Sequence, residues 1–167
     1  TEVLINNAGV MLLDTMENQP YEQWKKMVDI NIMGVLNGIA CVVKDMANRN
    51  SGTIINVSSV AGKSIFDNHT VYCGTKFAVH AISEGLRQEL AEKNVRVTTI
   101  APGIVKTNLL SGTTNQKIKQ GYEDYRDNSL GGALDADDIA NVIEYVCLMP
   151  QHICLREVVV THTKQKA

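Results

Sequence analysis

The sequence predicts an α/β fold in which a parallel sheet is covered by helices on both of its faces. Short apolar runs alternate with long stretches of helical periodicity along the whole chain. The short runs are almost free of charge, which is typical of strands buried on both faces. Because strand–helix–strand units close by right-handed crossovers, their repetition favours a parallel sheet. No internal repeat or linker divides the 167 residues, so one domain is expected.

The first half of the chain is expected to contain two strands and a long helix. Val3–Ile5 is an apolar run that ends at the turn-forming sequence Asn6-Asn7-Ala8-Gly9, which predicts a strand and a turn. A proline start signal predicts a helix from Tyr21 to about Asn48. The helix is apolar nearly all round from Ile30 to Met46, so it should be covered on more than one side. β-branched residues predict a second strand over Thr53–Val57.

The second half is expected to continue the alternation of helices and strands. The predicted elements are a helix from Val71 to about Lys93, a strand over Val95–Ile100 stopped by Pro102-Gly103, a helix capped by Asp135 that ends near Leu148, and a strand over Leu155–Thr161. The polar segment 111–132 has no strong period. We expect it to be mobile, with a short helix around Asn115–Arg126.

Composition and charge exclude several classes of function. The chain is 44% hydrophobic and 20% charged, as soluble globular proteins are. A net charge of −2 gives no reason to expect a nucleic acid or a membrane surface as partner. No 18 consecutive residues are apolar, so no transmembrane helix is predicted. The four cysteines lack paired spacing, which favours reduced thiols over a metal site.

A tyrosine and a lysine follow the second predicted strand. Ligands of open parallel sheets bind beyond the carboxyl ends of the strands. Tyr72 opens the helix there, and Lys76 lies four residues further on, so both side chains share one helical face. The ordinary tyrosine pKa of about 10 makes a poor acid–base catalyst near neutral pH. The lysine ammonium and an oxidised nicotinamide ring would lower that pKa. By itself the pair is a weak signal, because an exposed helical pair has the same spacing.

Five motifs together give the chain a resemblance to the short-chain dehydrogenase/reductase family over essentially its whole length. They are NNAG at Asn6–Gly9, the long-helix asparagine Asn31, Ser59 at 13 residues (72 − 59) before Tyr72, YxxxK at Tyr72–Lys76 and PGxVxT at Pro102–Thr107. The resemblance implies a Rossmann-like doubly wound parallel sheet and an NAD(P)-dependent oxidoreductase that acts on CH–OH groups. Val71–Val79 and Arg156–Gln165 are similar to the bacterial serine/3-hydroxy-acid dehydrogenase branch, which implies a small hydroxy or keto substrate.

The resemblance also implies a role for each matching residue. Tyr72 would exchange a proton with the substrate hydroxyl, and Ser59 would hydrogen-bond the substrate oxygen. Lys76 would bind the nicotinamide ribose, and Asn31 would hold a water in the proton relay. Besides Tyr72 and Lys76, the residues implied to bind the cofactor are Asn7, Ala8, Gly9, Pro102, Gly103, Ile104 and Thr107. The Ile104 backbone and the Thr107 hydroxyl would contact the nicotinamide carboxamide.

Several neighbouring residues allow other interpretations. Ser58 lies 14 residues (72 − 58) before Tyr72, and strand alternation points it away from Ser59. Lys63 could hold a substrate carboxylate, or it could be a solvated loop lysine. The GxxxG spacing of Gly34–Gly38 predicts close helix packing in a soluble protein rather than a membrane contact.

The front of the chain departs from the family. Members begin with a strand, a TGxxxGxG loop and a helix that cradle the cofactor pyrophosphate, and none of these is present here. Residues 1–167 are therefore expected to be the C-terminal two thirds of one NAD(P)-binding domain, without its first strands and helices. NADP is the favoured cofactor, and NAD stays open because the discriminating residue lies in that front segment.

Two alternatives and the expected partners complete the prediction. The chain could be a non-catalytic NAD(P)-sensing regulator on the same fold, or a fragment that binds no cofactor by itself. We otherwise expect a cytoplasmic enzyme with a small-molecule substrate and no metal. A homodimer or homotetramer is expected, because Tyr21–Asn48 and Val71–Lys93 correspond to the usual dimer-forming helices of relatives.

Overall fold

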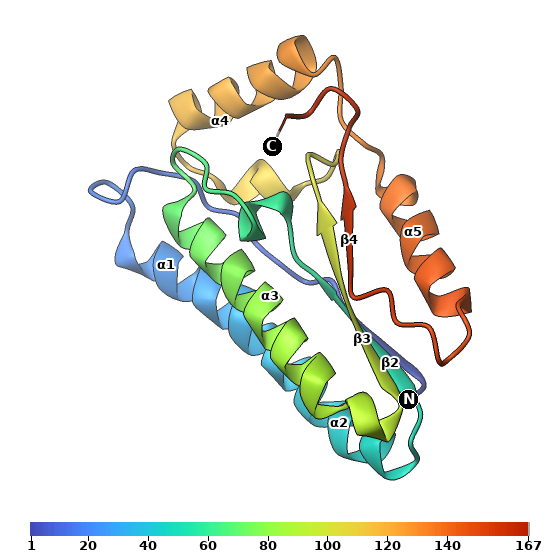
Figure 1. Ribbon diagram of the computed structural model, residues 1–167. Coiled ribbons are helices and arrows are strands. Elements are labelled where there is room, and N and C mark those ends of the chain that lie inside the picture. The colour runs from blue at the N-terminus through green and yellow to red at the C-terminus, as the bar shows by residue number, and fades with distance from the viewer. Residues whose placement is uncertain (167) are drawn as a thin grey trace.

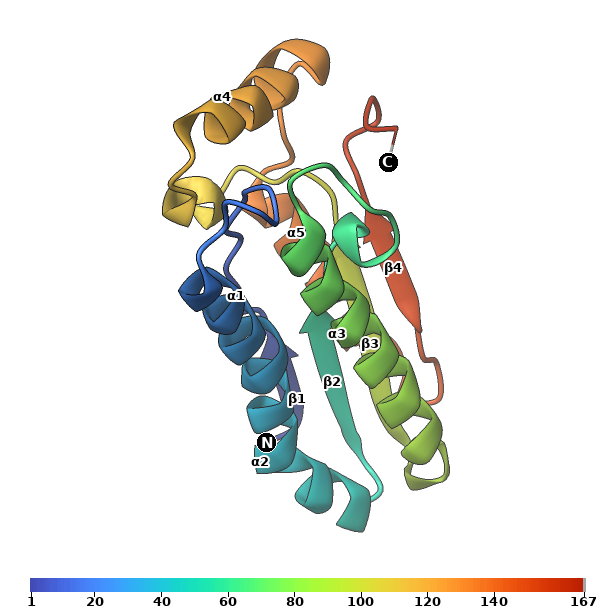
Figure 2. The same cartoon turned by 90° about the vertical axis from the view of Figure 1, so that its left-hand side faces the viewer.

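The computed structural model describes residues 1–166 and contains a parallel sheet between two layers of helices. The four strands lie side by side in sequence order, and every neighbouring pair is parallel: β1 (Val3–Asn6), β2 (Gly52–Val57), β3 (Val95–Pro102) and β4 (Glu157–Val160). One face is covered by α1 (Tyr21–Val28), α2 (Gly34–Asn48) and α3 (Thr70–Glu89), and the other by α5 (Ala136–Leu148) (Figures 1 and 2). The predicted Rossmann-like α/β fold is confirmed.

The two central strands place apolar side chains alternately on the two faces of the sheet. Ile54 of β2 packs with Val79 of α3 in a core cluster on the first face. The next residue, Ile55, packs on the other face with Ile139 and Val146 of α5. Because both faces of the sheet are covered, β2 and β3 are buried along nearly their whole length, including polar side chains such as Asn56 and Thr99.

The long helix predicted over 21–48 is present but contains an irregularity. A π-helical turn, Asp29–Met33, joins α1 to α2 without a break in the helical backbone. Such a turn carries one residue more than an α-helical turn, and it is frequent at functional sites. Asn31 lies in this turn, with only 1% of its surface exposed. The apolar periodicity did not predict the turn, because one inserted residue barely changes an almost uniformly apolar stretch.

The same helical stretch is long and apolar enough to cross a membrane, as judged by length and composition alone. Core helices of soluble proteins pass this test too. Here Val35, Ile39 and Val42 of α2 are buried in the core cluster against the sheet. Only 28% of the apolar window is buried within the described residues, so this face accounts for part of the apolar composition.

Several boundaries differ by a few residues from the predictions. β3 continues through Pro102, which pairs with Val160 at the edge of the sheet. α3 ends at Glu89 and is followed by a separate 3-10 turn, Ala91–Lys93, and β4 is shorter than the predicted strand.

The polar segment before α5 contains the short helix that was predicted. It is α4 (Gln116–Asp124), followed by a π-helical turn at Tyr125–Ser129. The predicted start of α5 is confirmed as well, because Asp135 and Asp138 form a capping box. The four cysteines are free thiols. Within residues 1–166, no three His, Cys, Asp or Glu side chains come together as a metal site.

The two glycines of the GxxxG sequence have different surroundings, which gives a matched pair of mutations. A Cβ on Gly38 would lie 2.2 Å from Asn6 Oδ1, whereas a Cβ on Gly34 would have no heavy atom within 4 Å. Asn6 cannot move freely, because its Nδ2 donates a 2.8 Å hydrogen bond to Asn56 Oδ1. We expect Gly38→Ala to lower the free energy of unfolding by about 1–3 kcal/mol through overpacking.

Gly34→Ala is the control and should raise the free energy of unfolding by about 0.5–1 kcal/mol, because alanine is the better helix former. Urea denaturation of both variants measures the two effects. Equal destabilisation by the two substitutions would contradict the close packing of α2 on β1.

Candidate active site

A cavity of about 960 Å³ lies at the carboxyl ends of β1, β2 and β3. Its lining includes all the residues predicted to contact the cofactor, namely Asn7, Ala8, Gly9, Tyr72, Lys76, Pro102, Gly103, Ile104 and Thr107. Ser59 lines it as well. The structure therefore brings residues from four separate segments of the chain to one place, as expected where parallel strands end at a common edge.

Asn31 lies beside this cavity and joins two of its walls. Its Oδ1 accepts a 2.8 Å hydrogen bond from the Val10 backbone N–H, and its Nδ2 donates to the Val10 carbonyl oxygen at 2.9 Å. The same Nδ2 donates to Thr75 Oγ1 at 3.0 Å. The amide thus connects the segment after β1 to Thr75 of α3. The family resemblance implies that Asn31 holds a water. Its hydrogen bonds with Val10 and Thr75 were not predicted from the sequence.

Tyr72 and Lys76 share one face of α3 and are both buried. They are 4% and 6% exposed, and the Lys76 ammonium lies 5.8 Å from the centre of the Tyr72 ring. Lys76 Nζ also donates a 3.1 Å hydrogen bond to the carbonyl oxygen of Val57, at the end of β2. Burial lowers the pKa of Lys76 to about 8.

The pKa of Tyr72 departs from the sequence prediction. Burial raises it above its ordinary value, and a hydrogen bond with Ser59 opposes this effect only in part. The sequence predicted a lowered Tyr72 pKa in the presence of Lys76 and an oxidised nicotinamide. In the chain without cofactor, the Tyr72 pKa is not lowered. The physical reason is that a phenolate in this wall loses more hydration than its hydrogen bond restores.

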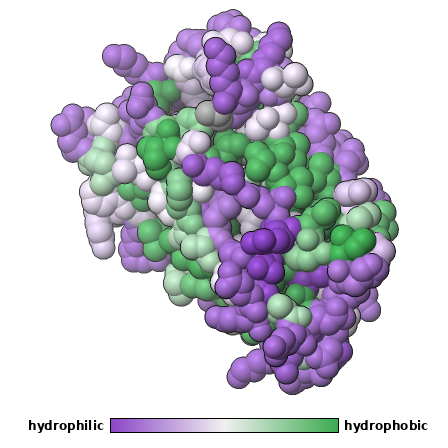
Figure 3. Space-filling view, viewed as in Figure 1, coloured by the Kyte–Doolittle hydropathy of each residue, from purple (hydrophilic) through white to green (hydrophobic). Residues whose placement is uncertain are grey.

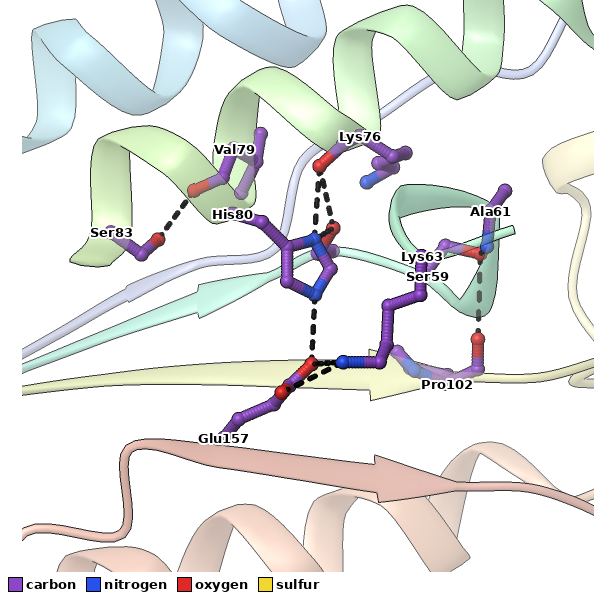
Figure 4. Close-up of polar contacts among 10 residues, drawn as sticks. Ser59, Ala61, Lys63, Lys76, Val79, His80, Ser83, Pro102 and Glu157 are labelled. Atoms are coloured by element: carbon purple, nitrogen blue, oxygen red, sulfur yellow. Dashed lines mark hydrogen bonds and ion pairs between the residues drawn. The ribbon is translucent and has the colours of Figure 1, made fainter. Parts of the chain in front are cut away.

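Ser59 caps a 3-10 turn, Val60–Gly62, that follows β2. Its Oγ accepts from the Ala61 backbone N–H at 3.1 Å and lies 3.4 Å from the Pro102 carbonyl oxygen, to which it donates (Figure 4). The neighbouring Ser58 has different partners: its Oγ donates to the Lys76 carbonyl oxygen at 3.1 Å. The two serines thus face different ways, as strand alternation predicted.

A cluster of three charged or titratable side chains holds the turn after Ser59. Glu157 of β4 accepts from Lys63 Nζ at 2.7 and 2.9 Å, and its carboxylate lies 3.1 Å from His80 Nε2 (Figure 4). We call Lys63, His80 and Glu157 the Glu157 clamp. Burial acts to raise the pKa of Glu157, but the hydrogen bonds and charges of Lys63 and His80 hold it below its usual range.

The Glu157 clamp fastens three elements together. Lys63 follows the 3-10 turn, His80 belongs to α3, and Glu157 opens β4. The turn also packs directly on the imidazole, because a Cβ on Gly62 would lie 2.3 Å from His80 Nδ1. The partner of Lys63 is thus a carboxylate of this chain, and Lys63 does not line the main cavity. Sequence reasoning missed His80 and Glu157, since their contact spans 77 residues and leaves no local pattern.

The segment after β3 is held by a residue near the end of the chain. The Ile104 backbone N–H donates to Gln165 Oε1 at 3.0 Å, and the Ile104 carbonyl oxygen accepts from the Leu134 N–H at 3.0 Å. Both backbone groups that were predicted to contact the cofactor are therefore engaged within the chain. Thr107 is exposed at the cavity, and its hydroxyl accepts from the Leu109 N–H at 3.3 Å.

The family model that describes short chain dehydrogenases matches residues 1–118. This chain belongs to that family. An uncharacterized oxidoreductase of Staphylococcus saprophyticus is 40% identical over 98% of the chain and 66% of its own length. Glycine betaine reductase of Emericella nidulans is 36% identical over 95% of the chain, which corresponds to 12% of that larger protein.

Solved structures of family members are similar in fold. Serine dehydrogenase complexed with NADP+ has a TM-score of 0.90 and 29% identity, over 99% of this chain and 66% of the other. ElxO with NADP bound has a TM-score of 0.80 and 28% identity, over 95% of this chain and 65% of the other. The chain thus spans about two thirds of the length of the short-chain dehydrogenases that it matches in structure.

Proposed function

We propose that the protein is an NAD(P)-dependent oxidoreductase that transfers a hydride between the cofactor and the carbinol carbon of a hydroxy or keto compound. The observation that carries this proposal is the meeting of Ser59, Tyr72 and Lys76 in the wall of one cavity, with the Lys76 ammonium 5.8 Å from the centre of the Tyr72 ring. Together with Asn31 these residues form the proposed catalytic set. Family membership supports the same reaction class.

The chemistry of the cavity suits a nicotinamide cofactor. Gly9 and Gly103 line the cavity at the ends of β1 and β3, and the Lys76 ammonium is a donor for ribose hydroxyls. NADP is the favoured form, because the two structures described above hold it. Bound there, the cofactor supplies the hydride. Residues 1–167 would be the C-terminal two thirds of the cofactor-binding domain.

The protein's own residues would move the proton. In the direction of reduction, Tyr72 donates its hydroxyl proton to the substrate oxygen as the hydride reaches the carbonyl carbon. Ser59 donates a hydrogen bond to that oxygen and stabilises its developing charge. The raised pKa keeps the Tyr72 phenol protonated but makes it a weaker acid, so proton transfer would depend on positive charge beside the phenolate. Lys76 then stabilises the phenolate, and Asn31 keeps the wall that carries both side chains in register.

The experiment that tests this proposal follows nicotinamide absorbance in the full-length protein. NADPH and NADH are each offered with small ketones, and NADP+ and NAD+ are each offered with 3-hydroxy acids in the reverse direction. We expect turnover, and a higher kcat/KM with NADPH than with NADH. Cofactor binding without any turnover would support the sensing alternative, and absence of binding would contradict both.

Assembly and location are proposals of the same kind. We propose a homodimer or homotetramer in the cytoplasm. Met33 and Leu36 are exposed on the long helix, and Val159 is exposed on β4. Figure 3 shows apolar residues gathered on the right-hand side of that view, where β4 and α5 lie. Such surfaces suit contacts between copies of one chain.

The Glu157 clamp should affect catalysis through the position of Ser59. We expect Glu157→Ala to lower kcat by about 10-fold or more, because small displacements of a catalytic group are costly. The KM for the cofactor should not change, since Glu157 is not among the residues that line the main cavity. Glu157→Gln should recover part of the loss, because its amide oxygen still accepts from Lys63. Steady-state kinetics at saturating cofactor measure both variants.

Glu84→Ala is the matched control for the Glu157 clamp. Glu84 also bridges two cationic side chains, Arg87 at 2.7 Å and Arg156 at 2.9 Å, but it does not touch the turn after Ser59. We expect Glu84→Ala to keep the wild-type kcat. Equal losses in Glu84→Ala and Glu157→Ala would contradict a positioning role.

A further inference from the structure

We propose that the substrate of this site is an uncharged carbonyl compound or alcohol with an aromatic or bulky apolar substituent. The proposal rests on the oxidoreductase function above and adds the class of substrate. It excludes amino acids and short hydroxy acids as preferred substrates. Three properties of the cavity support the proposal. It has a wall of aromatic rings, that wall is uncharged, and most cationic side chains near it are already paired within the chain.

The rings of the wall begin at the catalytic tyrosine. The His69 ring lies 6.3 Å from the Tyr72 ring, centroid to centroid, and 6.1 Å from the Tyr122 ring. Phe66 lies 5.9 Å from His69 on the same side. All four line the cavity, and we call Phe66, His69 and Tyr122 the aromatic wall. The protein's own rings lie at spacings that aromatic pairs prefer, and a substrate whose oxygen reaches Tyr72 would place its substituent beside them.

Aliphatic side chains complete the apolar surroundings of Tyr72. Met11 and Leu12, in the segment after β1, and Leu110, after β3, are buried in one cluster with it. All three line the cavity. A bulky apolar substituent would therefore leave water for apolar contacts, which favours its binding.

The aromatic wall is neutral near pH 7. Burial lowers the pKa of His69 below its usual value, so the imidazole is uncharged. Burial raises the pKa of Tyr122 to about 12, so its hydroxyl stays protonated. Neither ring offers a full charge to a substrate, and both keep an apolar face.

The ions around the cavity are poor partners for a charged substrate. Among the residues of 1–166 that line it there is no Asp or Glu, so a substrate ammonium would find no carboxylate. Arg126 already donates two hydrogen bonds to Asp127, at 2.7 and 2.8 Å, and Lys76 belongs to the proposed catalytic set. Lys63, the cation considered for a carboxylate from the sequence, is bound by Glu157.

One cationic side chain in the lining could still pair with the carboxylate of an acidic substrate. It is Lys26, on an exposed position of α1. An ionised carboxylate that enters the apolar part of the cavity away from it would lose hydration without a partner, which is costly. The relative named serine dehydrogenase makes the contrast useful, because an α-amino acid brings both an ammonium and a carboxylate.

The test compares a 3-keto ester, its acid and a second 3-keto ester whose ketone carries a phenyl group in place of the methyl group. Ethyl acetoacetate, acetoacetate and ethyl benzoylacetate are reduced with NADPH by the full-length protein. We expect kcat/KM to be at least about 100-fold higher for ethyl acetoacetate than for acetoacetate, and highest for ethyl benzoylacetate. Tyr122→Ala should lower kcat/KM for ethyl benzoylacetate by about 10-fold. Tyr145→Ala, a 58% exposed tyrosine outside the lining, should have no effect.

A binding measurement separates failure of this inference from failure of the proposed function. Benzamide, benzoate and phenylalanine are titrated against the NADPH complex, with the fluorescence of the bound cofactor as the readout. Tightest binding of benzamide without reduction of any ketone would support the substrate class and contradict the proposed function. Equal or tighter binding of benzoate or phenylalanine, or no binding of any of the three, would overturn the inference. A preference for acids that Lys26→Met abolishes would overturn it as well and identify Lys26 as the anion site.

Discussion

Tyr72→Phe is expected to lower kcat by about 1,000-fold, which lies within the usual contribution of general acid–base catalysis. The substitution removes the phenolic proton and keeps the ring that packs beside His69. Since Tyr72 is only 4% exposed, no water can easily take the place of its phenol as the acid. Single-turnover reduction with bound NADPH measures the chemical step directly.

Cofactor binding and a surface tyrosine provide the controls for this experiment. The dissociation constant of NADPH should change by less than about 3-fold, because a lost hydrogen bond of about 0.6 kcal/mol corresponds to that factor. Tyr21→Phe, at an exposed position of α1, should keep the wild-type rate. A Tyr72→Phe variant with the same kcat as the wild type would rule out the proposed mechanism.

Lys76→Met is expected to abolish turnover and at the same time to stabilise the folded chain. The ammonium is buried, and the difference between its ordinary pKa of 10.5 and its value of about 8 corresponds to about 3 kcal/mol of destabilisation near neutral pH. Methionine has a similar length and no charge. It leaves the Val57 carbonyl without its donor, which offsets part of the gain. A net increase in Tm of roughly 2–6 °C follows, as measured by calorimetry without cofactor.

The pH dependence gives the sign of the Lys76 effect independently of the melting temperature. Between pH 8 and 10.5 the unfolded chain holds the lysine proton and the folded chain has released it. The free energy of unfolding of the wild type should therefore increase as the pH rises through this interval. Lys76→Met should lose the increase, and Lys44→Met, at an exposed position of α2, should keep it. A lower Tm for Lys76→Met would show that contacts of the ammonium outweigh its burial.

Much of the fold could be predicted because the signals are local. The β2 and β3 sequences are rich in β-branched residues, which predicts strands, and Asp135 marks the start of α5 because it forms a capping box there. The Tyr72–Lys76 pair is local too, because four residues make one helical turn. The resemblance then placed Ser59 and the segment Pro102–Thr107 at the same site.

The features that the sequence did not reveal depend on distant parts of the chain. The carboxylate of Glu157 reaches Lys63 across 94 residues, and Gln165 bonds to Ile104 across 61. No spacing rule connects such positions, since the sheet order alone brings them together. The π-helical turn at Asn31 is different: it is local, but its extra residue is hidden in a uniformly apolar helix.

The long reach of the Glu157 clamp has a consequence for the order of events during synthesis. Domains generally fold as units during synthesis, so a domain completes its structure only after all of its elements have left the ribosome. Ser59, Tyr72 and Lys76 emerge well before β4, yet the turn that carries Ser59 has no carboxylate partner until Glu157 arrives. A nascent chain without β4 therefore contains Ser59, Tyr72 and Lys76 but cannot form the Glu157 clamp. The position of Ser59 would be fixed only when β4 pairs with β3. Competence for catalysis would be gained in one late step, when that strand closes the edge of the sheet.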